Sequence, residues 1–207
     1  MIYVIGDSHV EAFDDSFTKI NPSALTAYQN INKIESIEGK LAQFNIDKDI
    51  DILIFSFGEV DIRCHLGFIA DNNNRTYEDV IDECLTRYGM FLDHFIKCGF
   101  RIGVWGVIPS GPYDDINGNG RPSYKTYTER NELTAIFNKK LEFLCTQKRI
   151  IYKSIFDIIV NDMENYSLYY STNVVHLNAG KFKMYNNEKD CEKLIRNEFE
   201  EFLPGKP

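Results

Sequence analysis

Apolar runs and helical apolar stripes alternate along this chain. Four short runs are rich in strand-forming residues, at Tyr3–Ile5, Asp51–Phe57, Arg101–Ile108 and Arg149–Tyr152. The second run reads Asp-Ile-Leu-Ile-Phe-Ser-Phe and is almost continuously apolar, which is typical of a strand that is covered on both faces. We therefore predict four strands of a largely buried sheet.

Between these runs, apolar residues recur at helical spacing. One helix is predicted from Thr76 to Cys98, because Thr76 and Asp79 form a variant capping box and Gly99 is a natural stop. Two more helices are predicted from about 128 to 147 and from about 188 to 202.

Alternation of strands and helices favours an α/β fold, a three-layer α/β/α sandwich around a mostly parallel sheet. A length of 207 residues with 43% apolar residues fits a single domain over 1–207. Ligands of such sheets bind beyond the carboxyl ends of the strands. The candidate loops are therefore Gly6–His9, Gly58–Leu66 and Pro109–Tyr127.

Composition narrows the possible partners. The net charge is −8 and the 23 Lys and Arg are dispersed, so neither nucleic acid nor an anionic membrane surface is expected as a partner. No apolar stretch approaches the length of a membrane span, and a core strand that begins at residue 2 leaves no room for a signal peptide. The five cysteines form no C-x-x-C pair, which indicates free thiols and a cytoplasmic location. The sequence does not specify an oligomeric state.

Ser8 is the candidate nucleophile. It follows the first strand in Gly6-Asp7-Ser8, and Val10, Phe13 and Phe17 then recur at helical spacing. A serine between a buried strand and a helix N-terminus lies beside unpaired N–H groups that stabilise a developing oxyanion.

A hydroxyl nucleophile needs a base, and the chain has four histidines. His94 is expected to be exposed on its helix, His65 lies in a loop, and His9 is expected to point away from its neighbour Ser8. His176 precedes the last helix, where a late loop can return to the top of the sheet.

Three blocks together resemble the GDSL/SGNH hydrolase family. They are Gly6-Asp7-Ser8, Gly58-Glu59-Val60-Asp61 and Val175-His176-Leu177-Asn178, which occur in this order over nearly the whole chain. The resemblance implies the flavodoxin-like SGNH hydrolase fold and acyl transfer on esters without a cofactor or metal. It also implies that Ser8 is the nucleophile and an oxyanion donor through its N–H, and that His176 is the general base.

The third block departs from the family pattern, in which an asparagine amide donates to the oxyanion. Val60 stands in its place here and has no side-chain donor, while Gly58 of the same block is a candidate oxyanion or substrate-binding residue. Loss of one such donor costs roughly 100- to 1,000-fold in rate. Arg63 is the candidate replacement or substrate ligand, and a salt bridge from Arg63 to Glu59 or Asp61 is the alternative interpretation.

The resemblance assigns further roles. Asn173 stands where the family has the aspartate that orients the histidine, and its carbonyl oxygen can hold an imidazole. Asp7 is expected to shape the nucleophile turn and Asp61 to anchor the third block. Gly39 is the only glycine between Gly6 and Gly58, which makes it the candidate for the family's oxyanion glycine.

The sequence thus predicts a serine esterase or O-acyltransferase that acts on a small acyl ester, such as an acetyl ester, of a carbohydrate. One alternative is a catalytically weakened protein that binds a glycan or activated sugar in polysaccharide biosynthesis. A lesser alternative is a metallophosphoesterase with Asp7 and His9 as ligands, although the other metal-binding blocks of that family are missing.

Overall fold

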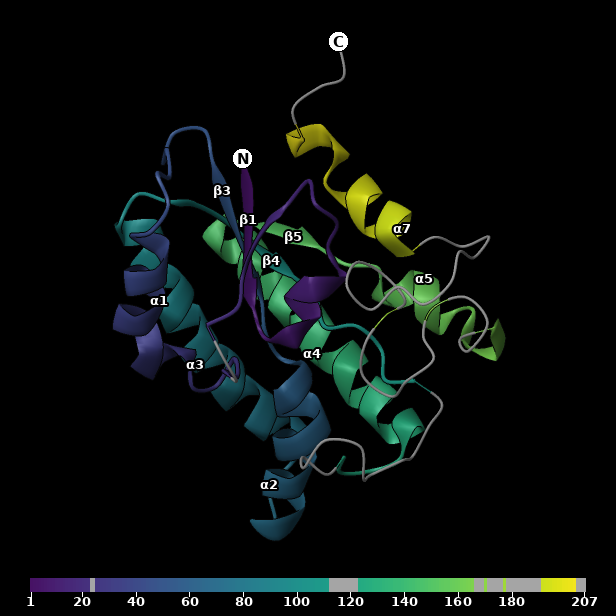
Figure 1. Ribbon diagram of the computed structural model, residues 1–207. Helices are drawn as coiled ribbons and strands as arrows, with labels where there is room; N and C mark the ends of the chain where they lie inside the picture. Colours follow the sequence, from purple (N-terminus) through teal and green to yellow (C-terminus); the bar gives the residue numbers. More distant parts are fainter. Residues whose placement is uncertain (23–24, 112–122, 166–169, 171–176, 178–190, 204–207) are drawn as a thin grey trace.

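The computed structural model describes residues 1–22, 25–111, 123–165, 170, 177 and 191–203, and five strands within them form a central sheet (Figure 1). Neighbouring strands are all parallel, in the order β2-β1-β3-β4-β5. The strands are β1 (Ile2–Gly6), β2 (Thr18–Ile20), β3 (Ile52–Ser56), β4 (Arg101–Trp105) and β5 (Ile151–Lys153). The predicted parallel sheet is confirmed.

The strand order reverses beside β1, since β2 lies on one side of it and β3 on the other. In a parallel sheet, such a switch point opens a crevice at the carboxyl ends of the strands, where ligands bind. Gly6 and Ser56 form the last register pair of β1 and β3. The turn that carries Ser8 therefore starts at this switch point.

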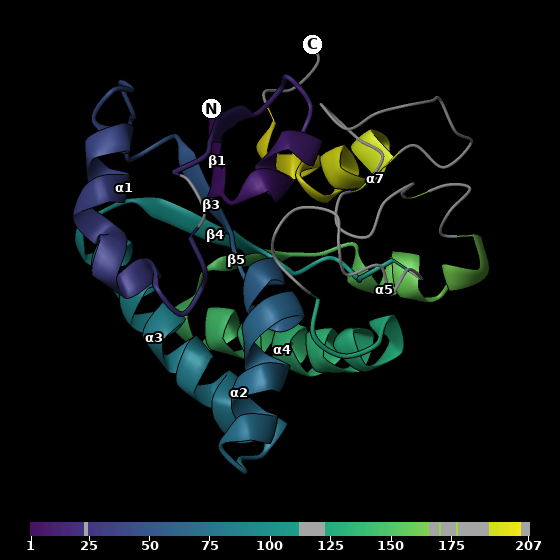
Figure 2. The ribbon, with the colours of Figure 1, turned by 60° about the horizontal axis from the view of Figure 1, so that its bottom comes forward.

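Helices cover both faces of the sheet (Figure 2). Side chains alternate between the faces along each strand. Tyr3 and Ile5 accordingly join one hydrophobic core, whereas Ile2 and Val4 join the other. The first core also contains residues of α1 (Ile34–Leu41), α3 (Tyr77–Lys97) and α4 (Tyr127–Lys148), and the second contains residues of α5 (Phe156–Val160) and α7 (Cys191–Glu198). This is the predicted three-layer arrangement.

Short helical segments complete the described chain. They are α2 (Gly67–Asn72), the π-helix η3 (Asp61–Leu66) and the 3-10 turns η1 (Ser8–Ala12), η2 (Asn30–Lys33), η4 (Met163–Asn165) and η6 (Glu200–Phe202).

The caps of the two long helices follow from their sequences. The Thr76 hydroxyl accepts the Asp79 N–H at 3.1 Å, and Gly99 follows the helix with φ +83°. α4 begins at Tyr127, one residue before the predicted start, because Thr126 forms a capping box with Glu129. Both predicted helices are confirmed.

Three sequence-based expectations are wrong in detail. The stretch after Ser8 forms only the short turn η1, because Phe13 is already extended. Residues 18–20 then form a strand that a three-residue, half-buried run does not reveal. The predicted loop Gly58–Leu66 is largely helical. The last predicted helix is confirmed over Cys191–Glu198 and is followed by the 3-10 turn Glu200–Phe202, while residues 188–190 lie outside the described residues.

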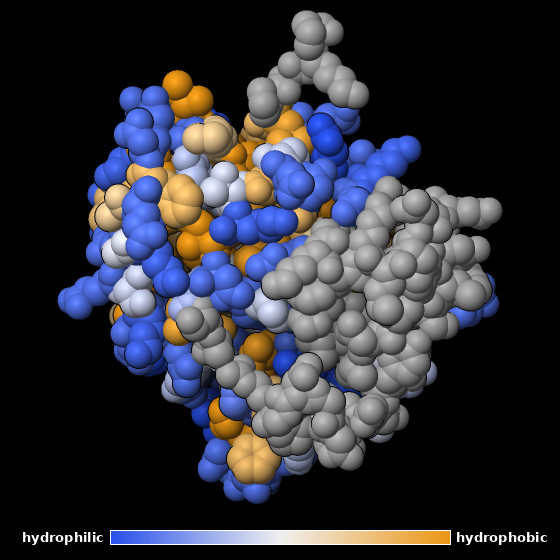
Figure 3. All heavy atoms as spheres, in the orientation of Figure 1, coloured by the Kyte–Doolittle hydropathy of each residue, from blue (hydrophilic) through white to orange (hydrophobic). Residues whose placement is uncertain are grey.

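Hydrophilic side chains cover most of the described surface in Figure 3, and apolar ones interrupt it in small groups. All five cysteines belong to the described residues and remain thiols. Among the described helices, none has both the length and the apolar character that crossing a bilayer requires.

Candidate active site

The turn after β1 exposes Ser8 between two buried residues. Asp7 caps η1, and its Oδ1 accepts both the His9 backbone N–H at 3.0 Å and a hydrogen bond from the His9 ring nitrogen Nδ1 at 2.6 Å. Asp7 and His9 are only 3% and 6% exposed, whereas Ser8 is exposed. Asp7 therefore shapes the turn, and the hydroxyl-bearing residue faces outward.

Two glycines allow the backbone to pass where the strands end. A Cβ on Gly6 would lie 2.2 Å from the Ser56 carbonyl oxygen, so β1 and β3 approach too closely there for any side chain. Gly58 has φ +125°, and a Cβ on it would lie 2.7 Å from Val107 Cγ2. Only glycine adopts that conformation readily. Gly58 thus turns the chain from β3 into the third block.

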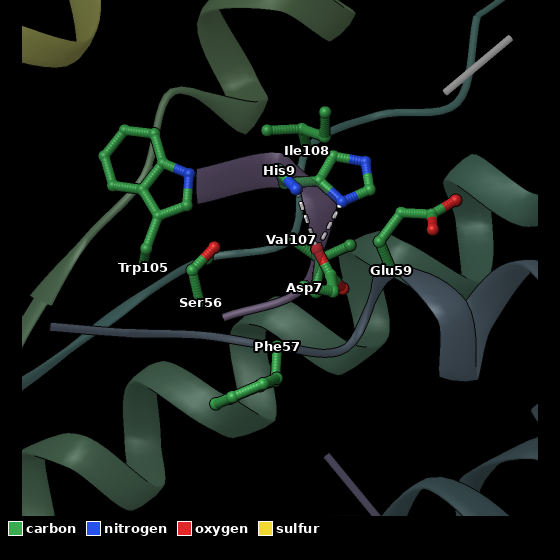
Figure 4. A pocket seen from close by; sticks show the side chains of 9 residues that line it. Asp7, His9, Ser56, Phe57, Glu59, Trp105, Val107 and Ile108 are labelled. Carbon is green, nitrogen blue, oxygen red and sulfur yellow. Dashed lines mark hydrogen bonds and ion pairs between the residues drawn. The ribbon is translucent and has the colours of Figure 1, made fainter. Parts of the chain in front are cut away.

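A small pocket opens at the carboxyl ends of β1, β3 and β4 (Figure 4). Its empty space measures about 230 Å³ with the open mouth included, and Figure 4 shows the His9 imidazole and the Asp7 carboxylate between Glu59 and Trp105. Its wall consists of Asp7, His9, Ser56, Phe57, Glu59, Trp105, Gly106, Val107 and Ile108. Of the three loops predicted to bind ligand, the first two supply Asp7, His9 and Glu59 to this pocket, and most of the third, residues 112–122, lies outside the described residues.

Asp61 anchors a neighbouring segment of the chain. Its Oδ2 accepts the Ala27 N–H at 2.7 Å and its Oδ1 accepts the Tyr28 N–H at 3.2 Å. The net pKa of Asp61 is raised from 3.8 to about 7, because burial, helped by the nearby Asp7 charge, outweighs the two N–H groups that lower it. The segment that Asp61 holds was not recognised in the sequence, because Thr26-Ala27-Tyr28 carries no motif.

Arg63 forms a bidentate ion pair with Glu59. Its Nε and Nη2 donate to the two carboxylate oxygens at 2.5 and 3.1 Å, and both side chains are about nine-tenths buried. Burial alone would lower the pKa of Arg63, but the Glu59 charge raises it above the ordinary value. The salt bridge that was the alternative interpretation of Arg63 is therefore present, with Glu59 as the partner. Val60, beside it, is buried and offers no side-chain donor.

Gly39 does not lie on a loop. It lies inside α1 at an exposed position, where its N–H belongs to the helical hydrogen-bond ladder. An oxyanion-donor role does not fit that position. The expectation came from elimination among glycines, which carries no information on whether the surrounding residues form a helix.

The remaining histidines differ in what the structure describes. His176 and Asn173 lie outside the described residues. His94 is only half-exposed, because its Nε2 is 2.7 Å from Glu38 Oε1. His9 lines the pocket, a place that the sequence did not predict, and it is buried whereas its neighbour Ser8 is exposed. The two-residue spacing of Asp7 and His9 was the signal that could have placed it there, since this spacing lets the capping carboxylate reach the ring.

The metallophosphoesterase alternative loses support from this geometry. The Asp7 carboxylate and His9 Nδ1 bond to each other. Within the described residues, no third His, Cys, Asp or Glu donor atom converges with theirs.

No protein-family model matches the chain, and no curated protein sequence matches it. Solved structures do. A member of the lipolytic G-D-S-L family from Veillonella parvula aligns with a TM-score of 0.54 and 11% identity, over 97% of this chain and 96% of that one. The chain has the fold of the GDSL/SGNH hydrolases.

Two further structures share this SGNH fold. Est24, a carbohydrate acetylesterase from Sinorhizobium meliloti, aligns with a TM-score of 0.53 and 12% identity, over 95% of this chain and 96% of Est24. A gut microbial diltiazem-metabolizing enzyme aligns with a TM-score of 0.58 and 11% identity over 98% of this chain. The chain spans less than half of the length of that enzyme, with 46% covered. These likenesses are likenesses of fold.

Proposed function

We propose that the chain is a serine esterase or O-acyltransferase that acts on a small acyl ester, such as an acetyl ester, of a carbohydrate. The observation that carries the proposal is the exposure of Ser8 on a tight turn at the switch point of an SGNH-type sheet, next to a pocket. A nucleophile on the first turn of such a sheet can be approached by an ester from solvent. The carbohydrate acetylesterase with the same fold supports the choice of substrate class by analogy.

In the proposed reaction, Ser8 Oγ attacks the ester carbonyl carbon while His176 takes the hydroxyl proton. The Ser8 N–H donates to the oxyanion, and His176 then returns the proton to the leaving alcohol. Water or a second alcohol releases the acyl group by the same steps in reverse. Asn173 would orient the imidazole through its carbonyl oxygen without adding negative charge.

The pocket favours a small acyl group. Its empty space of about 230 Å³ includes the open solvent at its mouth, so only a small group fits between its walls. Phe57, Val107 and Ile108 line it with apolar surface, which suits a methyl group, and Trp105 adds an indole N–H that can donate to an ester oxygen.

A second candidate function is the binding of a glycan or activated sugar with little or no catalysis. Two observations favour it. Val60 offers no donor to an oxyanion, and the Arg63 guanidinium is engaged by Glu59. A missing donor costs roughly 100- to 1,000-fold in rate. The cytoplasmic location and a role in polysaccharide biosynthesis stay predictions from the sequence.

Labelling with a fluorophosphonate probe tests the proposal. We expect wild type to be labelled, and Ser8→Ala and His176→Ala to lose the label while remaining folded. Ser36→Ala, an exposed serine on α1, is the matched control and should be labelled like wild type. A screen of acetylated sugars should then reveal hydrolysis or transfer that depends on the same two residues.

Two results would contradict the proposal. A label that persists in Ser8→Ala places the reactive group elsewhere. A folded wild type that takes no label and hydrolyses no acetylated sugar supports the glycan-binding function instead, which equilibrium binding of sugars would then measure.

A further inference from the structure

Three side chains with metal-binding donor atoms converge away from the candidate active site. Glu38 on α1, His94 on α3 and Cys98 at the end of α3 each place one donor atom within 4.8 Å of the other two. His94 Nε2 lies 2.7 Å from Glu38 Oε1 and 3.6 Å from Cys98 Sγ. In the part of the chain that the structure describes, this is the one such group of His, Cys, Asp and Glu residues.

Glu38, His94 and Cys98 lie far from Ser8, toward the amino ends of the strands. Cys98 precedes the amino end of β4, which begins at Arg101, whereas Ser8 follows the carboxyl end of β1. Because the five strands are all parallel, their amino ends lie at one end of the sheet and their carboxyl ends at the other. α1 and α3 lie side by side in both ribbon views. A ligand here would be separate from the ester chemistry.

The geometry suits a tetrahedral ion. Zinc binds nitrogen, oxygen and sulfur at about 2.0–2.3 Å, so tetrahedral donors lie about 3.4 Å (N to O) to about 3.6 Å (N to S) apart. The distance from His94 Nε2 to Cys98 Sγ already has this value. The distance from His94 Nε2 to Glu38 Oε1 must open by about 0.7 Å. The Glu38 side chain is 41% exposed and can move by that amount.

The helix spacing and the charges also suit a divalent cation. His94 and Cys98 are four residues apart on one helix, which places them on the same face. A thiolate and a carboxylate together neutralise a doubly charged ion. The Lys48 ammonium donates to the Cys98 backbone carbonyl at 2.7 Å and not to the thiol. Partial exposure leaves room for water as a fourth ligand.

We propose that Glu38, His94 and Cys98 bind a borderline divalent transition metal, with Zn²⁺ as the best fit. On binding, the Cys98 thiol releases its proton to solvent, and the His94 imidazole becomes the neutral tautomer that carries its proton on Nδ1. The hydrogen bond between His94 Nε2 and Glu38 Oε1 then gives way to one bond from each atom to the ion. No group is oxidised or reduced. The ion links α1 to α3 and stabilises their contact. Sequence reasoning did not expect a metal, since Glu38 and His94 are 56 positions apart.

Titration of the metal-stripped full chain with Co²⁺ tests this site. We expect a thiolate-to-cobalt charge-transfer band that saturates at one ion per chain and disappears when Zn²⁺ is added. Cys98→Ser should abolish the band. Glu38→Gln and His94→Gln should weaken the affinity at least about tenfold, since even residues that only support metal ligands contribute that much. Cys64→Ser, which changes another half-buried thiol, should leave the band intact.

Thermal unfolding gives a second readout. Zn²⁺ should raise the Tm of wild type and of Cys64→Ser, and should raise the Tm of Glu38→Gln by clearly less at the same concentration. The half-exposed position of Glu38 makes this variant decisive should Cys98→Ser fail to fold. A titration without a charge-transfer band, or a band that persists in Cys98→Ser, would overturn the proposal. Neither readout uses ester hydrolysis, so the outcome is independent of the proposed function.

Discussion

Substitution of Asp61 by asparagine should change how the stability of the protein depends on pH. The Asp61 carboxyl is 1% exposed, and burial raises its pKa from 3.8 to about 7. An acid with a raised pKa binds its proton more tightly in the folded state. Its contribution to stability is therefore largest at low pH and decreases as the pH rises through about 7. The amide of Asp61→Asn stays neutral and contributes no such slope.

The size of this effect follows from the two pKa values. The difference between about 7 and 3.8, at about 1.36 kcal/mol for each pH unit, makes about 4 kcal/mol over the full titration. Between pH 4.5 and 8, about 3 kcal/mol of it is lost. The amide also replaces one acceptor of the Ala27 and Tyr28 N–H groups by a donor. That change should lower the stability of the variant by about 1–3 kcal/mol, and this loss should not depend on pH.

Urea denaturation of both proteins from pH 4.5 to 8 measures the difference. We expect the free energy of unfolding of wild type minus that of Asp61→Asn to decrease by about 3 kcal/mol over this interval. Asp15→Asn removes a surface carboxylate and serves as the control for general loss of charge. A difference between wild type and Asp61→Asn that is constant with pH would refute the raised pKa of Asp61.

Three further substitutions test the structure around the site. Gly58→Ala should lower stability by about 2–4 kcal/mol in thermal melts, because φ is +125° and the new methyl group would meet Val107 at 2.7 Å. Arg63→Met should cost about 3–5 kcal/mol in chemical denaturation by leaving Glu59 buried without its partner, and the added change Glu59→Gln should restore most of that loss. Thr126→Ala removes a capping box and should cost about 0.5–2 kcal/mol, measured by urea denaturation.

Much of the fold was predictable because its signals are local. The buried strands β1 and β3 are continuous apolar runs, and α3 carries both its cap and its glycine stop in the sequence. β2 escaped prediction because three half-buried residues at the edge of a sheet have no usable period. The helical spacing of Val10, Phe13 and Phe17 also arises when a short turn and the loop after it bury residues against one core.

Sequence motifs predicted only part of the candidate site. The positions of Ser8, Asp7 and Asp61 follow from motifs at the ends of strands. The bond between Asp61 and the Ala27 N–H joins backbone to side chain across 34 positions, and no local pattern encodes it. The place of His9 in the pocket was not predicted, because alternation along a strand does not continue into a tight turn. There the capping carboxylate, rather than the strand, sets the direction of the ring.

The two outer strands of the sheet bear on how copies of the chain behave in concentrated solution. Among the described residues, β2 and β5 are each three residues long, and each includes a lysine, Lys19 or Lys153. A short edge strand with a charged side chain is a poor template for strand addition by another molecule. Few of its backbone groups can pair, and the ammonium group must lose its water. With a net charge of −8, copies also repel one another. The long, aggregation-prone apolar strands β1 and β3 are thereby kept inside the sheet, and self-association by edge pairing is disfavoured.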